Sequence, residues 1–279
     1  TAEHSRCSTV GAAELAQRNF EAGLQGMVFT DHHYLWANDE IKELRRKIEV
    51  PNHFVILAGQ EVTTPEFGDV LIYGADRSIA KGTSFDEIAQ SFPRAALVWA
   101  HPYRGEKRPA EARFFDSRLA GVEIFSSNHS VTESHRALCD WHRHKFTAIA
   151  GTDTHAPSYA ALYPTVFDHP VATIEEMAEE IRAGRCRPYF EEIPRSGATD
   201  TMVTELIIGP RSRHTLPEKY IIKVQRNPRA WKTAARSSEI MEEIAGYGFR
   251  EGRFRIPKSY GRDEESLAVI EEGIEGKNL

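Results

Sequence analysis

Short apolar runs recur along the first part of the chain, and most are followed at once by an acidic residue or a histidine. The runs are rich in β-branched and aromatic side chains, which is typical of strands buried in a parallel sheet. We predict strands over Met27–Thr30, Phe54–Ala58, Val70–Gly74, Ala96–Ala100, Gly121–Val122 and Phe146–Ala150, with a further strand before His4.

Helix signals alternate with these runs as far as about residue 190. Amphipathic spacing predicts helices over Ala12–Gln25 and Asp39–Glu49. Capping boxes predict helices that begin at Ser84, Ser130 and Thr173. Such alternation is the pattern of a β/α fold, and seven strands favour a TIM-like barrel.

The alternation fails beyond Arg187. Short apolar stretches are interrupted by prolines over Glu191–Ile222. A helix is predicted over Lys232–Gly246, and Gly248–Gly261 is basic and predicted to be irregular. We therefore expect two domains, a barrel over residues 1–190 and a C-terminal extension of unknown role over residues 191–279.

The charge is uneven along the chain. The net charge is −6, with 21 basic and 30 acidic side chains in residues 1–209 against 14 and 11 in residues 210–279. An acidic first part fits a site whose carboxylates are offset by bound cations. We expect no nucleic-acid partner, because nucleic-acid-binding proteins usually carry a concentrated basic face.

The cellular compartment is inferred from two features that the sequence lacks, a membrane helix and a disulfide framework. No apolar stretch approaches the roughly 20 residues of a membrane helix, so no membrane association is expected. The three cysteines, Cys7, Cys139 and Cys186, are odd in number and widely spaced, which predicts no disulfide framework. A reduced, cytoplasmic protein is the default expectation.

Acids and histidines gather where the predicted strands end. Side chains at the C-terminal ends of barrel strands usually carry the chemistry of such folds. When they are His, Asp and Glu, a multinuclear metal centre is the economical interpretation. The motifs are Glu3-His4-Ser5, Thr30-Asp31-His32-His33, Gly59-Gln60-Glu61, Ala100-His101-Pro102, Gly121-Val122-Glu123 and Gly151-Thr152-Asp153-Thr154-His155.

In this order the motifs, together with Gly68–Gly74, resemble those of the polymerase and histidinol phosphatase (PHP) family of metal-dependent phosphoesterases. The resemblance covers roughly residues 1–190. It implies a distorted seven-stranded β/α barrel with two or three Mn, Fe or Zn ions at its C-terminal face.

The resemblance also implies a set of metal ligands. His4, Glu61 and Asp153 would hold one ion, and Glu61 would bridge to a second ion completed by His101. A third ion would be held by His32 and His155, and Asp31 would orient a ligand. Independently of the family, a bridging carboxylate neutralises two close cations, and imidazoles bind divalent metals through one nitrogen.

Three departures from the family pattern bear on these sites. Ala2 stands where the first histidine of the family's His-x-His is expected, and Asp69 replaces a strand histidine. Neither Thr9 nor Val10 substitutes well for an acid or histidine of the family that falls there. The site is thus expected to hold two metals or to be weakened.

Several neighbouring residues admit two interpretations. His33 and His129 either support the ligands or are structural, and Glu123 either joins the site or caps a loop. Asp69 is either a ligand or an exposed acid on an edge strand, and Cys7 reads more as packing than as a ligand.

Two arginines stand close to the predicted ligands. Arg6 and Arg104 follow His4 and His101, and a planar guanidinium suits bidentate binding of phosphate oxygens. A surface salt bridge is the alternative for both.

We therefore expect a metal-dependent phosphoesterase that hydrolyses a small phosphomonoester or nucleotide with water activated by the cations. The alternatives are a metallohydrolase acting on a carbon–nitrogen or ester bond, and a metal-depleted binding protein. A phosphate-binding pair of arginines at the barrel mouth would favour the first.

Overall fold

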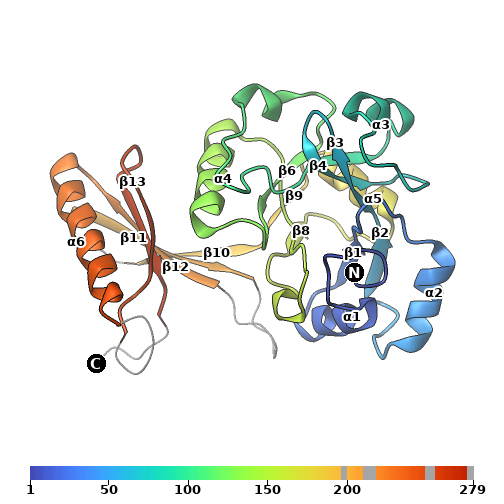
Figure 1. The fold of residues 1–279 in the computed structure, drawn as a ribbon, viewed down its shortest axis with the longest axis horizontal. Coiled ribbons are helices and arrows are strands. Elements are labelled where there is room, and N and C mark those ends of the chain that lie inside the picture. The colour runs from blue at the N-terminus through green and yellow to red at the C-terminus, as the bar shows by residue number, and fades with distance from the viewer. Residues whose placement is uncertain (196–199, 210–217, 249–254, 275–279) are drawn as a thin grey trace. The chain divides into compact units, whose positions relative to one another are not determined.

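The computed structural model describes residues 1–195, 200–209, 218–248 and 255–274. The chain forms two compact units, of which the first contains Thr1–Tyr189 and the second begins at Phe190 (Figure 1). None of the described helices is both long and apolar enough to cross a membrane.

The first unit begins with a small α/β layer. Strands β1 (Gly26–Phe29) and β2 (Val55–Ala58) pair in parallel, and helices α1 (Ala12–Glu21) and α2 (Asn38–Lys47) accompany them. Their apolar faces meet in a core that contains Phe29, Trp36 and Phe54. The two helices confirm the amphipathic spacing, although both end a few residues earlier than predicted.

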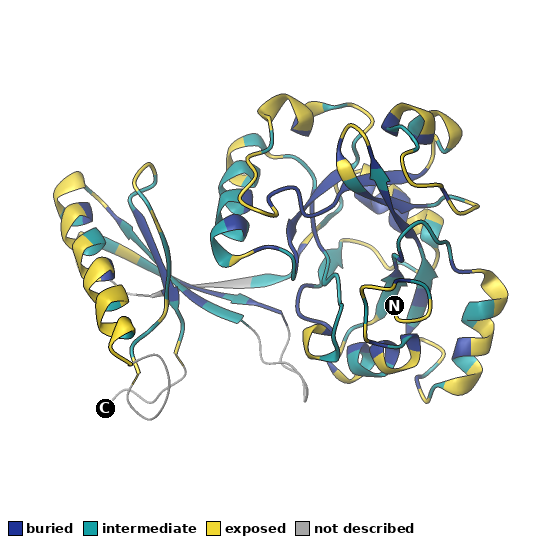
Figure 2. Ribbon diagram, viewed as in Figure 1, coloured by how far each residue is buried: buried dark blue, intermediate teal, exposed yellow. Residues whose placement is uncertain are grey.

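A five-stranded sheet forms the centre of this unit. Its order is β3 (Gln60–Thr64), β4 (Gly68–Tyr73), β5 (Ala96–Trp99), β6 (Gly121–Phe125) and β7 (Ala148–Ala150). The pairs β3–β4 and β4–β5 are antiparallel, whereas β5, β6 and β7 run parallel. Figure 2 shows these strands largely buried beneath helices whose outer faces are exposed.

The predicted seven-stranded β/α barrel is wrong. In the described residues none of the four sheets closes, and β1–β2 forms a sheet of its own. Two local causes are visible. Beyond Gly59 the described segment that follows β1 keeps only a single parallel bridge, between His32 and Glu61, so the β1–β2 ladder does not extend along β3. The chain next turns back as a β3–β4 hairpin, where a barrel requires a helical crossover.

The strand expected before His4 is also absent, because residues 1–7 form turns. The remaining elements of the first unit are α3 (Phe85–Ser91), α4 (Val131–His144), α5 (Ile174–Arg182), the 3-10 turns Glu111–Phe115 and Pro157–Tyr159, and the antiparallel pair β8 (Thr165–Phe167) and β9 (Cys186–Pro188).

The three predicted capping residues each accept a backbone N–H. Ser84 accepts from Glu87, Ser130 from Glu133 and Thr173 from Glu176. The capped helix α5 packs against β4 and β5, where Ile181 and Met177 meet Leu71 and Val98 in a core cluster. The sheet is thereby packed with apolar side chains where α5 covers β4 and β5.

The second unit is an antiparallel sheet with one long helix. The strand order is β10 (Phe190–Arg195), β11 (Thr201–Ile208), β12 (Glu218–Gln225), β14 (Ala268–Glu272) and β13 (Ser259–Asp263), and the helix is α6 (Pro228–Gly246). The predicted helix is confirmed and starts earlier, because Asn227 caps it and proline suits its first turn. The strands were not predicted. The role of residues 191–279 stays open. Of the segment Gly248–Gly261, which was expected to be irregular, residues 249–254 lie outside the described residues.

Candidate metal centre

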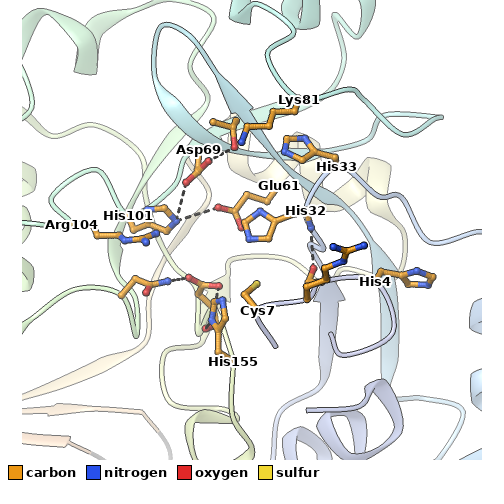
Figure 3. Close-up of a pocket in the computed structure, with 15 residues that line it drawn as sticks. His4, Cys7, His32, His33, Glu61, Asp69, Lys81, His101, Arg104 and His155 are labelled. Atoms are coloured by element: carbon orange, nitrogen blue, oxygen red, sulfur yellow. Dashed lines mark hydrogen bonds and ion pairs between the residues drawn. The ribbon is translucent and has the colours of Figure 1, made fainter. Parts of the chain in front are cut away.

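A cleft of about 610 Å3 opens on the first unit, and its lining gathers the charged residues of distant motifs. All seven predicted ligands reach it, together with both predicted arginines (Figure 3). The lining residues are His4, Ser5, Arg6, Cys7, His32, His33, Glu61, Thr63, Asp69, Lys81, His101, Arg104, Asn128, Asp153 and His155.

The β3–β4 hairpin supplies the first group of candidate ligands. Thr63 lies opposite Asp69 in the ladder, and strand side chains two residues apart share a face, so Glu61 and Asp69 project to the same side. The Nε2 atom of His101 is 3.2 Å from Oε1 of Glu61 and 3.9 Å from Oδ2 of Asp69. Glu61, Asp69 and His101 therefore offer a compact set of two carboxylates and one imidazole that could hold a metal ion.

The backbone fixes His101 in this group. Its N–H donates to Oε2 of Glu123 at 2.8 Å, and its φ of 29° lies in the left-handed region that ends β5 abruptly. Burial disfavours the charged ring, but the hydrogen bond to Glu61 and the charges of Glu123 and Glu61 outweigh it and raise the pKa of His101 to about 9. A cation bound here would take the place of that proton.

Acidic side chains crowd beneath the cleft. Glu123 and Glu61 are 2% and 4% exposed, and burial raises the pKa of Glu123 to about 8. Burial and the charge of Glu61 likewise raise the pKa of Asp153 above its usual range. Throughout the described ranges, no lysine or arginine forms an ion pair with these three carboxyls. Such a concentration of carboxyl groups, two of them with raised pKa values, fits divalent cations, which would take the place of the protons and offset the negative charge.

A second group of candidate ligands lies beside the first. Cys7, His32 and His155 each offer a ligand atom within 4.8 Å of the others. The Nδ1 atom of His32 is 3.7 Å from Oε2 of Glu61, so the two groups adjoin. Nδ1 of His155 is 2.8 Å from the carbonyl oxygen of Asp153. Asp153 has a left-handed backbone, with φ 46°.

His4 is not brought into either group. Its ring stacks on Tyr34 with centroids 3.7 Å apart, and its Nε2 is 3.1 Å from Oε1 of Glu40 on α2. Figure 3 shows the ring directed away from Glu61. The predicted set of His4, Glu61 and Asp153 around one ion is therefore not assembled, and Ala2 lies in a turn with no neighbouring strand face to share with His4.

Asp31 is a buried acceptor behind the site. It takes hydrogen bonds from Ser5 Oγ at 2.6 Å and from Trp36 Nε1 at 2.7 Å, and it does not line the cleft. Ser5 Oγ in turn accepts the N–H of His32 at 3.2 Å. Asp31 is thus linked through Ser5 to the backbone of His32, and its carboxylate lies outside the cleft lining.

The other supporting candidates differ from one another. Glu123 holds the backbone of His101, so it belongs to the frame of the site. His129 is buried, and its Nε2 accepts the N–H of Tyr103 at 3.3 Å; burial lowers the pKa of His129 to about 4, so its ring is neutral. His33 lines the cleft in a left-handed conformation with φ 56°.

Five lining residues were not among the predicted site residues: Ser5, Cys7, Thr63, Lys81 and Asn128. Cys7, which the sequence favours as a packing residue, is instead exposed in the cleft beside His32 and His155. Thr63 donates to Asp69 at 2.7 Å, and Asn128 Nδ2 donates to Asp153. Lys81 adds a third cationic side chain. Two of the five carried a signal in the sequence, because Ser5 lies within the first motif and Cys7 lies two residues beyond it.

Comparison with known proteins leaves the family open. No protein-family model matches the chain. An uncharacterized protein from Methanocaldococcus jannaschii is 28% identical over 109 residues, which are 38% of this chain, and the chain spans 61% of that relative's length.

Two solved structures show low similarity. PsfC from Pseudomonas syringae is 13% identical with a TM-score of 0.48, over 63% of this chain and 81% of PsfC. A provisionally named metal-dependent phosphoesterase from Bifidobacterium adolescentis is 16% identical with a TM-score of 0.40, over 55% of this chain and 86% of that one. Sequence identities and TM-scores this low assign no function to the chain.

Proposed function

We propose that this protein is a metal-dependent phosphoesterase that hydrolyses a small phosphomonoester or nucleotide. The supporting observation is that one cleft unites an acidic and imidazole cluster with the cationic side chains of Arg6, Lys81 and Arg104. Anionic ligands suit cations, and cationic side chains at the same opening suit an anionic substrate.

The candidate metal ligands and the cationic side chains would have different roles. Glu61, Asp69 and His101 would hold divalent cations (two or three ions of Mn, Zn or Fe in the whole cleft), which when bound lower the pKa of water and stabilise charge on phosphoryl oxygens. Arg104 and Lys81 would bind the non-bridging oxygens and so fix the orientation of the phosphate. Glu123 would keep His101 in place through the backbone.

The three cationic side chains favour phosphate over a neutral amide or ester. Arg6, Lys81 and Arg104 are all exposed at the cleft, and none forms an ion pair in the portion of the chain that is described. A site for an uncharged substrate would gain nothing from three unpaired cations, whereas a phosphate dianion gains charge-assisted hydrogen bonds.

The test is a substrate panel read together with metal content. The full chain, purified with its metals quantified, is assayed on phosphomonoesters, nucleotides, carboxyl esters and amides, with Mn2+, Zn2+ or Fe2+ supplied. Hydrolysis of a phosphoester that is abolished by a chelator supports the proposal. Hydrolysis confined to amides or carboxyl esters, or no hydrolysis with the metals fully bound, refutes it.

A further inference from the structure

We propose that Cys7 supplies a thiolate ligand to the cation site expected at His32 and His155, so that this site prefers Zn2+ to Mn2+ and differs in kind from the carboxylate site at Glu61. This inference rests on the proposed metal centre but not on the reaction that it would catalyse. A sulfur and two imidazoles suit zinc, whereas carboxylate-rich sites also accept harder ions.

The three ligand atoms already lie together. One ligand atom from each of Cys7, His32 and His155 lies within 4.8 Å of the other two, although the residues come from segments far apart in the sequence. Figure 3 shows Cys7 between His32 and His155. A catalytic zinc site commonly takes three protein ligands and leaves the fourth position to water or substrate.

The backbone holds Cys7 between its two partners. On one side Ser5 Oγ accepts the N–H of His32 at 3.2 Å. On the other side both the N–H and the hydroxyl of Thr9 donate to the carbonyl oxygen of His155 at 2.9 Å. Cys7 lies midway along the short segment between these two attachments, so its position beside both histidines is fixed on either side.

The other cysteines provide matched controls. Cys139 lies on α4 with its sulfur 3.6 Å from Nε2 of His135, and Cys186 lies in β9. Neither belongs to a group of ligand atoms found in the described residues. A thiolate–metal signal from this protein is therefore expected from Cys7 alone.

The site adjoins the carboxylate group without duplicating it. His32 Nδ1 is 3.7 Å from Glu61 Oε2, so one cation would lie on the sulfur side of His32 and the other on the side of Asp69 and His101. Two adjacent positions, one with a soft sulfur ligand and one with hard carboxylate ligands, would let the cleft bind two different cations without His4.

The experiment is a titration of the full chain with Co2+ or Cd2+ after chelation and removal of the chelator. Thiolate ligation produces near-ultraviolet charge-transfer absorption, which we expect to saturate at one equivalent per chain. Cys7→Ser should abolish the band, while Cys139→Ser and Cys186→Ser should retain it. Added Zn2+ should displace the signal, and added Mn2+ should not.

A second measurement on the unmodified protein makes the test independent of variant folding. Zn2+ should block alkylation of Cys7, read by mass spectrometry of its peptide, and leave alkylation of Cys139 unchanged. Absence of the band, its persistence in Cys7→Ser, or alkylation of Cys7 at saturating Zn2+ overturns the thiolate site. Phosphoester hydrolysis measured on the same samples reports the proposed function separately, because either result can hold while the other fails.

Discussion

His101 and Glu61 are 40 residues apart in the chain, yet Nε2 of His101 lies 3.2 Å from Oε1 of Glu61. Both side chains are buried, at 7% and 4% exposure. Their contact joins the end of β5 to the start of the β3–β4 hairpin, and it sets the centre of the cleft on which the predictions below depend.

Replacing Glu61 by Gln should release at least one metal ion per chain. The amide keeps the shape of the side chain but removes the charge that holds cations between His101 and His32. Metal content by elemental analysis should fall, and hydrolysis should be lost with it. Glu87→Gln, on the exposed face of α3, is the control and should keep both. Full metal content in Glu61→Gln would remove Glu61 from the site.

Replacing Arg104 by Ala should weaken phosphoester hydrolysis by about tenfold, since a charged hydrogen bond is worth about 1.5 kcal/mol at the lower end of its range. The lower end applies because Arg104 is exposed. Metal content should not change, and inorganic phosphate should inhibit the variant less. Arg108, also exposed but outside the cleft lining, gives the control Arg108→Ala. Equal kcat/KM for both variants would show that Arg104 does not touch the substrate.

Replacing Gly151 by Ala should destabilise the first unit. A Cβ at this position would lie 2.2 Å from Oε1 of Glu123, and the buried carboxyl has to move. Overpacking of this kind costs about 1–3 kcal/mol, which denaturant unfolding measures. At Gly246, in α6, a Cβ meets nothing within 4 Å, so Gly246→Ala should be neutral or stabilising. An unfolding free energy unchanged by Gly151→Ala would contradict this packing.

Removing divalent cations should lower the thermal stability of the protein. Bound cations offset the repulsion among Glu61, Glu123 and Asp153, and a ligand present at 100 times its Kd stabilises the folded state by about 2.7 kcal/mol. Tm should therefore rise with Zn2+ or Mn2+ after chelation. The rise should shrink in Glu61→Gln, and an equal rise in both proteins would place the stabilising ions elsewhere.

The local elements of the first unit were readable from the sequence. Apolar runs such as Ala96–Ala100 became strands, and the serine and threonine caps at Ser84, Ser130 and Thr173 begin helices as predicted. These features depend on neighbours a few residues away, through strand periodicity and side-chain hydrogen bonds to the first helical turn. The chemical types in the cleft were readable too, because strand ends carry the acids and histidines.

The tertiary structure decided how those pieces join. The sequence does not show that β3 and β4 pair antiparallel as a hairpin. This pairing and the separate β1–β2 sheet are found in place of the predicted barrel. Nor does it show that His4 stacks on Tyr34 while Cys7 reaches His32 and His155. Strand partners and side-chain directions depend on contacts between segments far apart in the chain, and periodicity and spacing carry no information about which distant segments meet.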